Sequence, residues 1–182
     1  ALLSKGHKYD LKTSVLKALD GLAFFDAPKS DGEYIKIIGL IDQKRSEKWI
    51  KRSYIKGPSN FDAFKVILPA ANGSGAIGEV LSTPLIGAPL IGAPLIGHTQ
   101  TFISIGSFDT EEEAKACMKY VKSKFARTLL GVLKITQHNP GPKWKYVPLQ
   151  DFTSSSDIDW SQSVAEIDDE IEFIETHVKA MD

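Results

Sequence analysis

The sequence predicts an α+β fold in which a twisted, mixed β-sheet packs on one long amphipathic helix. Short apolar segments at residues 34–41, 64–68 and 102–105 have the composition of buried strands. From Ala114 to Leu133, apolar residues recur every three or four positions, as they do on one face of a helix. The chain has 182 residues, of which 42% are hydrophobic, and this is enough to build the core of one domain.

The first third of the chain predicts a short helix followed by a hairpin. Residues 1–20 carry Leu11, Val15, Leu16 and Leu19 at helical spacing, and turn residues fill positions 21–33. Residues 34–41 (YIKIIGLI) predict a strand, 42–47 a charged turn, and 49–55 (WIKRSYI) the returning strand. Residues 64–68 (FKVIL) predict a third strand, which Pro69 stops.

The middle of the chain is rich in glycine and proline. Residues 70–76 predict a loop of small residues, and residues 77–81 a possible strand. Residues 84–97 contain the unit PLIG three times, with one alanine between successive copies. Because proline at every fifth position excludes a regular helix or a central strand, we expect an irregular apolar loop here.

The long helix has a clear start signal in the sequence. Thr110 and Glu113 have the spacing of a capping box, and Asp109, Glu111 and Glu112 place negative charge where a helix N-terminus favours it. We expect about 25 helical residues, or roughly 37 Å at 1.5 Å per residue. A short edge strand at 144–147 and an acidic helix at about 163–178 are expected to follow.

Charge is unevenly distributed along the chain. The formal net charge is −1, but residues 1–149 carry 21 Lys+Arg against 13 Asp+Glu, whereas residues 150–182 carry one Lys against ten acids. The body is therefore basic and the tail acidic. A basic body is compatible with a polyanionic partner such as nucleic acid.

Several classes of protein are disfavoured by composition and motifs. No apolar run approaches the roughly 20 residues of a membrane span. The single cysteine, Cys117, excludes an internal disulfide and favours a reducing, cytoplasmic location. The start of the chain carries no Met and no signal pattern, which indicates an excised fragment. Signatures of serine hydrolases, kinases and adenine methyltransferases are missing, and the histidines are scattered.

The strongest candidates for binding are basic residues of the predicted hairpin. They lie within residues 43–56, together with two aromatic residues, and are Lys44, Arg45, Lys48, Lys51 and Arg52. Such residues would contact DNA phosphates, with arginine also reading base edges. The alternative is a solvated hairpin face, since alternate side chains of a strand point to opposite sides.

Two further candidates lie in the small-residue loop. Asn72 and Ser74 stand among glycines, which would let the backbone approach a ligand closely. The loop lacks the lysine of a P-loop and the spacing of a dinucleotide fingerprint, so a plain flexible loop is equally consistent with it.

A nuclease site is a rival hypothesis. Asp109, Glu113 and Lys115 have the residue types of a PD-(D/E)xK-like nuclease, which binds a divalent metal through carboxylates. However, no proline precedes Asp109, the spacing is very short, and the acids already have a role at a helix start.

Several stretches resemble a known family. They are residues 50–55 (IKRSYI), 64–87 (FKVILPAANGSGAIGEVLSTPLIG), 98–108 (HTQTFISIGSF), 120–137 (YVKSKFARTLLGVLKITQ) and 144–161 (WKYVPLQDFTSSSDIDWS). Together they resemble the C-terminal target-recognition domain of restriction–modification enzymes that carry a TaqI-like adenine-N6 methyltransferase. In this family an endonuclease and a methyltransferase often share one polypeptide.

The resemblance implies a non-catalytic domain that reads double-stranded DNA beside those catalytic domains. S-adenosylmethionine and Mg²⁺ would then belong to the other domains, with no cofactor in this segment. The expected organisation is a connecting segment at 1–33, a target-recognition domain at 34–161 and an acidic helix at 162–182. A protein-interaction module that uses the acidic helix remains a third hypothesis.

Overall fold

The computed structural model describes residues 11–71, 81, 86–133, 144 and 147–166. It confirms the α+β class. In chain order the elements are α1 (Val15–Ala18), β1 (Tyr34–Ile41), β2 (Lys44–Lys51), the 3₁₀ helix η1 (Arg52–Tyr54), β3 (Phe64–Pro69), β4 (Leu90–Gly92), β5 (Ile96–His98), β6 (Phe102–Phe108), α2 (Glu111–Lys122) and α3 (Lys124–Leu133).

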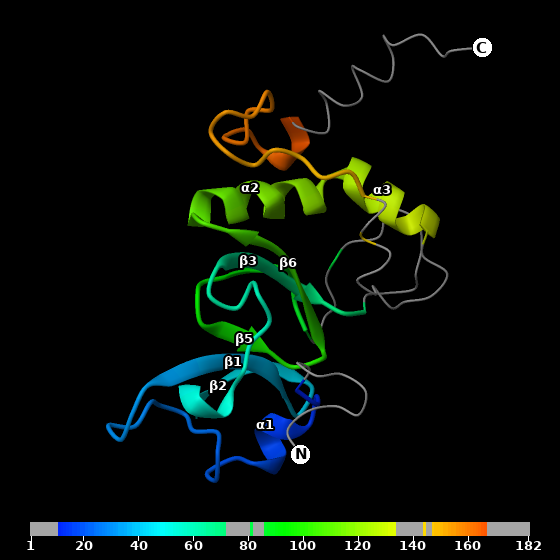
Figure 1. The fold of residues 1–182 in the computed structure, drawn as a ribbon. Helices are drawn as coiled ribbons and strands as arrows, with labels where there is room; N and C mark the ends of the chain where they lie inside the picture. Colours follow the sequence, from blue (N-terminus) through cyan, green and yellow to red (C-terminus); the bar gives the residue numbers. More distant parts are fainter. Residues whose placement is uncertain (1–10, 72–80, 82–85, 134–143, 145–146, 167–182) are drawn as a thin grey trace, which may run out of the picture.

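The described strands form two three-stranded sheets, whereas the sequence predicted one. The first sheet has the order β2-β1-β5, with β1 antiparallel to β2 and parallel to β5. The second has the order β4-β3-β6 and is antiparallel throughout. Figure 1 shows the layers in sequence: α1, the β2-β1-β5 sheet, the β4-β3-β6 sheet, and then α2 with α3.

The repeated PLIG unit contributes to both sheets, so the prediction of an irregular loop at 84–97 was wrong. Its second copy supplies β4 and its third copy supplies β5. Both are edge strands that begin after the proline, so the missing proline N–H breaks no ladder. A Cβ on Gly92 would meet Ile67 Cδ1 at 2.6 Å, and one on Gly97 would meet Ile37 Cδ1 at 2.7 Å. The glycines of the second and third copies therefore leave room for an isoleucine of the neighbouring strand.

The hairpin turn is shorter than the predicted turn at 42–47. Asp42 and Gln43 alone connect the strands, with φ of 49° and 64°, as in a two-residue turn of type I′. β2 therefore begins at Lys44, and the predicted second strand at 49–55 ends early because η1 follows it. Charged residues belong in this strand because part of it is exposed, and Lys36 forms an ion pair with Glu47 across β1 and β2 at 2.7 Å.

The predicted long helix is divided at Ser123. The backbone of Ser123 is extended there, with φ −60° and ψ 152°. Its Oγ donates to Tyr120 O at 2.7 Å and accepts from Ala126 N–H at 3.2 Å, so one buried side chain serves the end of α2 and the start of α3. At the other end of α2 the capping interaction is confirmed: Thr110 Oγ1 accepts from Glu113 N–H at 3.2 Å.

The segment after α3 docks on α2. Phe152 packs with Phe108, Tyr120 and Trp160 at ring distances of 5.8, 5.9 and 5.2 Å. Lys119 Nζ donates to the carbonyls of residues 160, 161 and 162 at 2.6, 3.2 and 2.8 Å. These contacts fix the part of residues 147–166 that lies over the outer face of α2 (Figure 1).

Of the remaining predicted elements, one is not a strand, one begins as predicted, and parts of two lie outside the described residues. At 144–147 Val147 N–H donates to Trp144 O at 3.1 Å, and the described ends of this segment form a turn in place of the predicted strand. Ser163 and Glu166 form a reciprocal capping box, which opens a helix at residue 164. The rest of the predicted acidic helix, and the possible strand at 77–81 apart from Leu81, lie outside the described residues.

The described core has three parts. The first lies between α2, α3 and the β4-β3-β6 sheet and includes Val66, Leu68 and Ala126. The second joins α1 and residues 11–24 to the first sheet. A small third cluster connects the two sheets through Ile38, Ile67 and Phe102. Among the described residues, no helix is both long enough and apolar enough to cross a membrane.

Candidate nucleic-acid interface

Lys48 is held inside the fold. It lies in β2 and is only 6% exposed, next to the apolar cluster of α1 and β1. Its Nζ donates to Asp20 Oδ1 at 2.8 Å and to Asp26 Oδ1 at 2.6 Å. These two hydrogen bonds raise the pKa of Lys48, the one to Asp20 most strongly. The ammonium group is therefore charged and engaged with two acids of the protein itself.

Arg45 is half-buried, and its guanidinium contacts other parts of the protein. Its Nη2 donates to Ala88 O at 2.6 Å, and its guanidinium lies 5.5 Å from the centre of the Phe102 ring. Desolvation by burial lowers the pKa of Arg45. Because Ala88 adjoins β4 and Phe102 begins β6, Arg45 connects β2 to the other sheet.

Lys51, the last residue of β2, and Arg52, the first residue of η1, pair with acids as well. Lys51 Nζ donates to Asp31 Oδ2 at 3.0 Å, and this hydrogen bond raises the pKa of Lys51. Arg52 Nη1 donates to Ile55 O at 2.6 Å, and its Nη2 is 3.9 Å from Asp62 Oδ1. Both ion pairs are partly exposed, so solvent weakens them.

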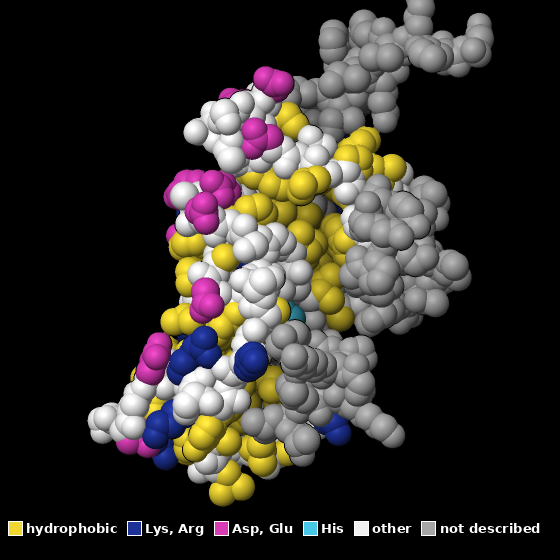
Figure 2. Space-filling view, viewed as in Figure 1, with side chains coloured by type: hydrophobic (Ala, Val, Ile, Leu, Met, Phe, Trp, Pro, Cys, Tyr) yellow, Lys and Arg dark blue, Asp and Glu magenta, His cyan; other side chains and the backbone are white. Residues whose placement is uncertain are grey.

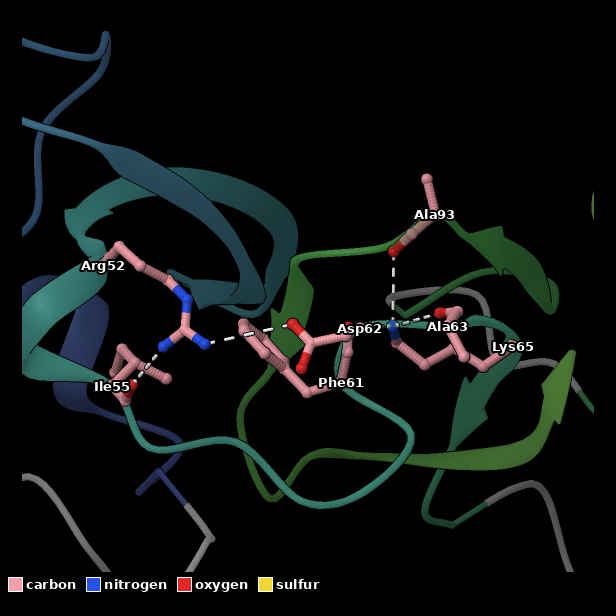
Figure 3. A network of polar contacts seen from close by, with 7 residues as sticks. All are labelled: Arg52, Ile55, Phe61, Asp62, Ala63, Lys65 and Ala93. Carbon is pink, nitrogen blue, oxygen red and sulfur yellow. Dashed lines mark hydrogen bonds and ion pairs between the residues drawn. The ribbon is translucent and has the colours of Figure 1, made fainter. Parts of the chain in front are cut away.

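Lys65 is a buried cation that no motif in the sequence singles out. It is 2% exposed, and its Nζ donates to the carbonyls of Phe61, Ala63 and Ala93 at 3.1, 3.0 and 3.2 Å. Figure 3 shows Phe61 and Asp62 between Arg52 on one side and Lys65 on the other. Desolvation lowers the pKa of Lys65 to about 8, against the opposing effect of Asp62.

Lys65 holds together the segments that connect the two sheets. Ala93 lies between β4 and β5, which belong to different sheets, and Phe61 packs in the core of the first sheet. The three carbonyls that Lys65 binds therefore join the two sheets through one ammonium group. The sequence signal was a lysine between apolar residues in 64–68, but its acceptors are backbone atoms that no side-chain pattern indicates.

Lys44 differs from the other four hairpin cations. It is exposed, and its side chain has no ion-pair partner among the residues that the structure describes. It stands opposite Ile41, directly after the turn. Four of the five basic residues thus contact acids or carbonyls of the protein, and Lys44 is exposed. Their contact with DNA stays a prediction. Asn72 and Ser74 lie outside the described residues.

Two of the three residues of the rival nuclease hypothesis, Glu113 and Lys115, have structural partners. Glu113 Oε2 accepts from Asp109 N–H at 3.2 Å, and Lys115 forms an ion pair with Glu111 at 2.9 Å. Both interactions belong to the first turns of α2. Within the described part of the chain, no group of three or more His, Cys, Asp or Glu residues could hold a metal ion.

Comparisons with known proteins do not assign the chain to a family. No protein-family model, no curated protein and no solved structure matches it.

Proposed function

We propose that this chain is a DNA-recognition domain that places a methyltransferase and an endonuclease of the same cytoplasmic polypeptide on their target site. The proposal assigns S-adenosylmethionine and Mg²⁺ to those catalytic domains and no catalytic residue to this one. It rests on the family resemblance over residues 34–161 and on the excess of 21 Lys+Arg over 13 Asp+Glu in residues 1–149.

The observation that carries the proposal furthest is the position of the positive charge. In the view of Figure 2, Lys and Arg side chains gather over the lower half, around the β1–β2 layer. Asp and Glu are more frequent over the start of α2 and the segment above it. Some Asp and Glu side chains lie there too, but an excess of positive charge attracts a polyanion and raises the rate of encounter. DNA phosphates would therefore approach the β1–β2 layer, away from the acidic half.

The division of labour in such a domain follows from its chemistry. Lysine contacts to phosphates position a protein on the duplex but carry no sequence information. Reading of bases would come from polar side chains on loops, for which Asn72 and Ser74 remain the candidates. Without the catalytic domains, we expect the chain to bind duplex DNA weakly and with little sequence preference.

The experiment is a binding titration of the full chain with a fluorescently labelled duplex of mixed sequence, followed by anisotropy at increasing salt. Counterion release predicts that the logarithm of the association constant falls linearly with the logarithm of salt concentration. A lack of binding at low salt, or binding that salt does not affect, would overturn the proposal. A labelled acidic polypeptide serves as the control for a protein-binding module.

A further inference from the structure

One end of the β2-β1-β5 sheet brings together three exposed lysines from distant parts of the chain. β1 ends at Ile41, and Lys44 stands opposite it. Lys17, on α1, forms an ion pair with Asp42 in the hairpin turn. The segment before α1 reaches the same end, because Gln100 N–H, just after β5, donates to Leu11 O at 2.7 Å and places Lys12 there. Because Lys17 is already paired with Asp42, we leave it out and call Lys12, Thr13 and Lys44 the lysine edge.

A chain of hydroxyl groups fixes the position of Thr13. Thr99 Oγ1, which is fully buried, donates to Thr101 Oγ1 at 3.2 Å. Thr101 Oγ1 in turn donates to Thr13 Oγ1 at 3.0 Å. Thr13 is therefore an acceptor in this chain, and within the described residues its own O–H has no acceptor. A hydroxyl group has one hydrogen to donate, so that of the half-buried Thr13 remains for an acceptor outside the described residues.

Within the described residues, no ion pair compensates the positive charge of the lysine edge. Lys12 and Lys44 are exposed and have no ion-pair partner in the described part of the chain. Most other cations of this layer do have acidic partners, namely Lys17, Lys36, Lys48, Lys51 and Arg52. The exceptions are Arg45, which donates to Ala88 O, Lys29, which lies over the Phe25 ring, and Lys56, which is exposed. Lys29 precedes β1 and Lys56 follows β2, so both are close in sequence to the opposite end of the sheet, where Tyr34 pairs with Lys51.

The lysine edge also adjoins the end of β3. Ala70 N–H, the first residue after β3, donates to Thr101 O at 2.9 Å. Thr101 is the residue that donates to Thr13. The chain thus passes the lysine edge immediately before the glycine-rich segment, so a duplex held at this edge would lie near the point where that segment begins.

We propose that the lysine edge binds the sugar–phosphate backbone of duplex DNA. Lys12 and Lys44 each neutralise a phosphate, and the O–H of Thr13 donates to a phosphate oxygen between them. This inference rests on the proposed function and assigns a surface to it. Of the five hairpin cations it keeps only Lys44 as a phosphate contact, because the other four contact acids or carbonyls of the protein.

The test compares two double variants that change the net charge equally. Lys12→Gln/Lys44→Gln removes the charge of the lysine edge, and Lys29→Gln/Lys56→Gln removes the two unpaired charges at the opposite end of the same layer. Binding of the full chain to one labelled duplex is measured by anisotropy over a range of salt concentrations. We expect the edge variant to lose about tenfold in affinity at low salt and to reduce the salt slope by about 2, since each phosphate contact contributes about 0.9. The control should stay within about threefold of wild type.

Thr13 supplies a second comparison that charge alone does not explain. Thr13→Val removes the hydroxyl at nearly constant volume, whereas Thr13→Ser retains it. We expect the valine variant to bind more weakly at unchanged salt slope, and the serine variant to bind as wild type. Urea unfolding of each variant checks that the fold persists.

The outcomes separate the inference from the function on which it rests. If wild type binds duplex DNA and the two double variants lose affinity equally, or the edge variant loses none, the lysine edge is not the site, and the proposed function stands. If wild type fails to bind at low salt, the proposed function itself fails. Selective loss in the edge variant, with the serine and valine variants behaving as stated, supports the lysine edge.

Discussion

The Nζ of Lys48 lies 2.6 Å from Oδ1 of Asp26, 22 residues earlier in the chain. Together with Asp20, this contact ties the loop after α1 to the middle of β2. A residue that the sequence presents as one of a row of DNA-binding cations is therefore part of the structure that holds the first sheet and its covering segment together.

The first prediction concerns the stability that this contact provides. Lys48→Met retains the apolar stem but removes the charge, and we expect the free energy of unfolding to fall by about 1–2 kcal/mol. The expected loss of stability is modest because both acids are at least half exposed, so water can solvate their carboxylates when the lysine is absent. Urea unfolding followed by circular dichroism measures it. Lys44→Met is the matched control and should change stability by less than about 0.5 kcal/mol. Equal effects in the two variants would contradict the distinction drawn here.

The second prediction concerns pH and Lys65. Its pKa is about 8 in the folded state, below its ordinary value of 10.5. Between these values the folded state binds fewer protons than the unfolded state, so stability rises with pH through this window and is lost as pH falls through 8.

Lys65→Met removes this titration and leaves other groups unchanged. The difference in free energy of unfolding, wild type minus variant, should therefore increase from pH 8 to pH 10, by on the order of 1 kcal/mol per pH unit at most. Urea titrations at several pH values measure it. A difference that is flat with pH would show that burial does not perturb this lysine.

The third prediction concerns Ser123. Its Oγ serves both helices, and the side chain is fully buried, so Ser123→Ala should cost about 1–2 kcal/mol. Ser53→Ala, at an exposed position of η1, is the control. A Ser123→Ala protein with increased helical signal and unchanged stability would mean that one continuous helix is as favourable as two.

The fourth prediction concerns the cysteine. Burial raises the pKa of the Cys117 thiol to about 12, and its side chain lies in the core beneath α2. Because the thiolate is the reactive form, a thiol reagent at pH 8 should modify the folded protein far more slowly than the urea-unfolded protein. Comparable rates in the two states would place Cys117 outside the core.

Local patterns predicted several elements well. The strand at 34–41 has the bounds of β1, because its apolar residues are buried in the first sheet. The Thr110 cap on Glu113 N–H also formed, because the two residues are three positions apart, although the Glu113 carboxylate accepts from Asp109 N–H instead of Thr110 N–H. The division of the long helix was missed, since the one-residue interruption leaves Val121, Phe125 and Leu129 at helical spacing.

Other features depend on partners far away in the sequence. The second and third copies of the repeat in 84–97 form strands because two different sheets each offer an edge to them. Lys48 and Lys65 are satisfied by residues 22 and 28 positions away, a distance at which no periodicity operates. The lysine edge likewise consists of residues 12, 13 and 44, which come to one end of the first sheet only through β-sheet pairing and the threonine hydrogen bonds.

Amide hydrogen exchange of the full chain, with and without saturating duplex DNA at low salt, tests the central claim most directly. We expect duplex DNA to slow exchange at residues 12–17, at the turn formed by Asp42 and Gln43, and at residues 99–101, and we expect high salt to abolish this protection. Protection confined to α2 and residues 147–166, or none anywhere at low salt, would contradict the claim that the β1–β2 layer meets DNA at the lysine edge.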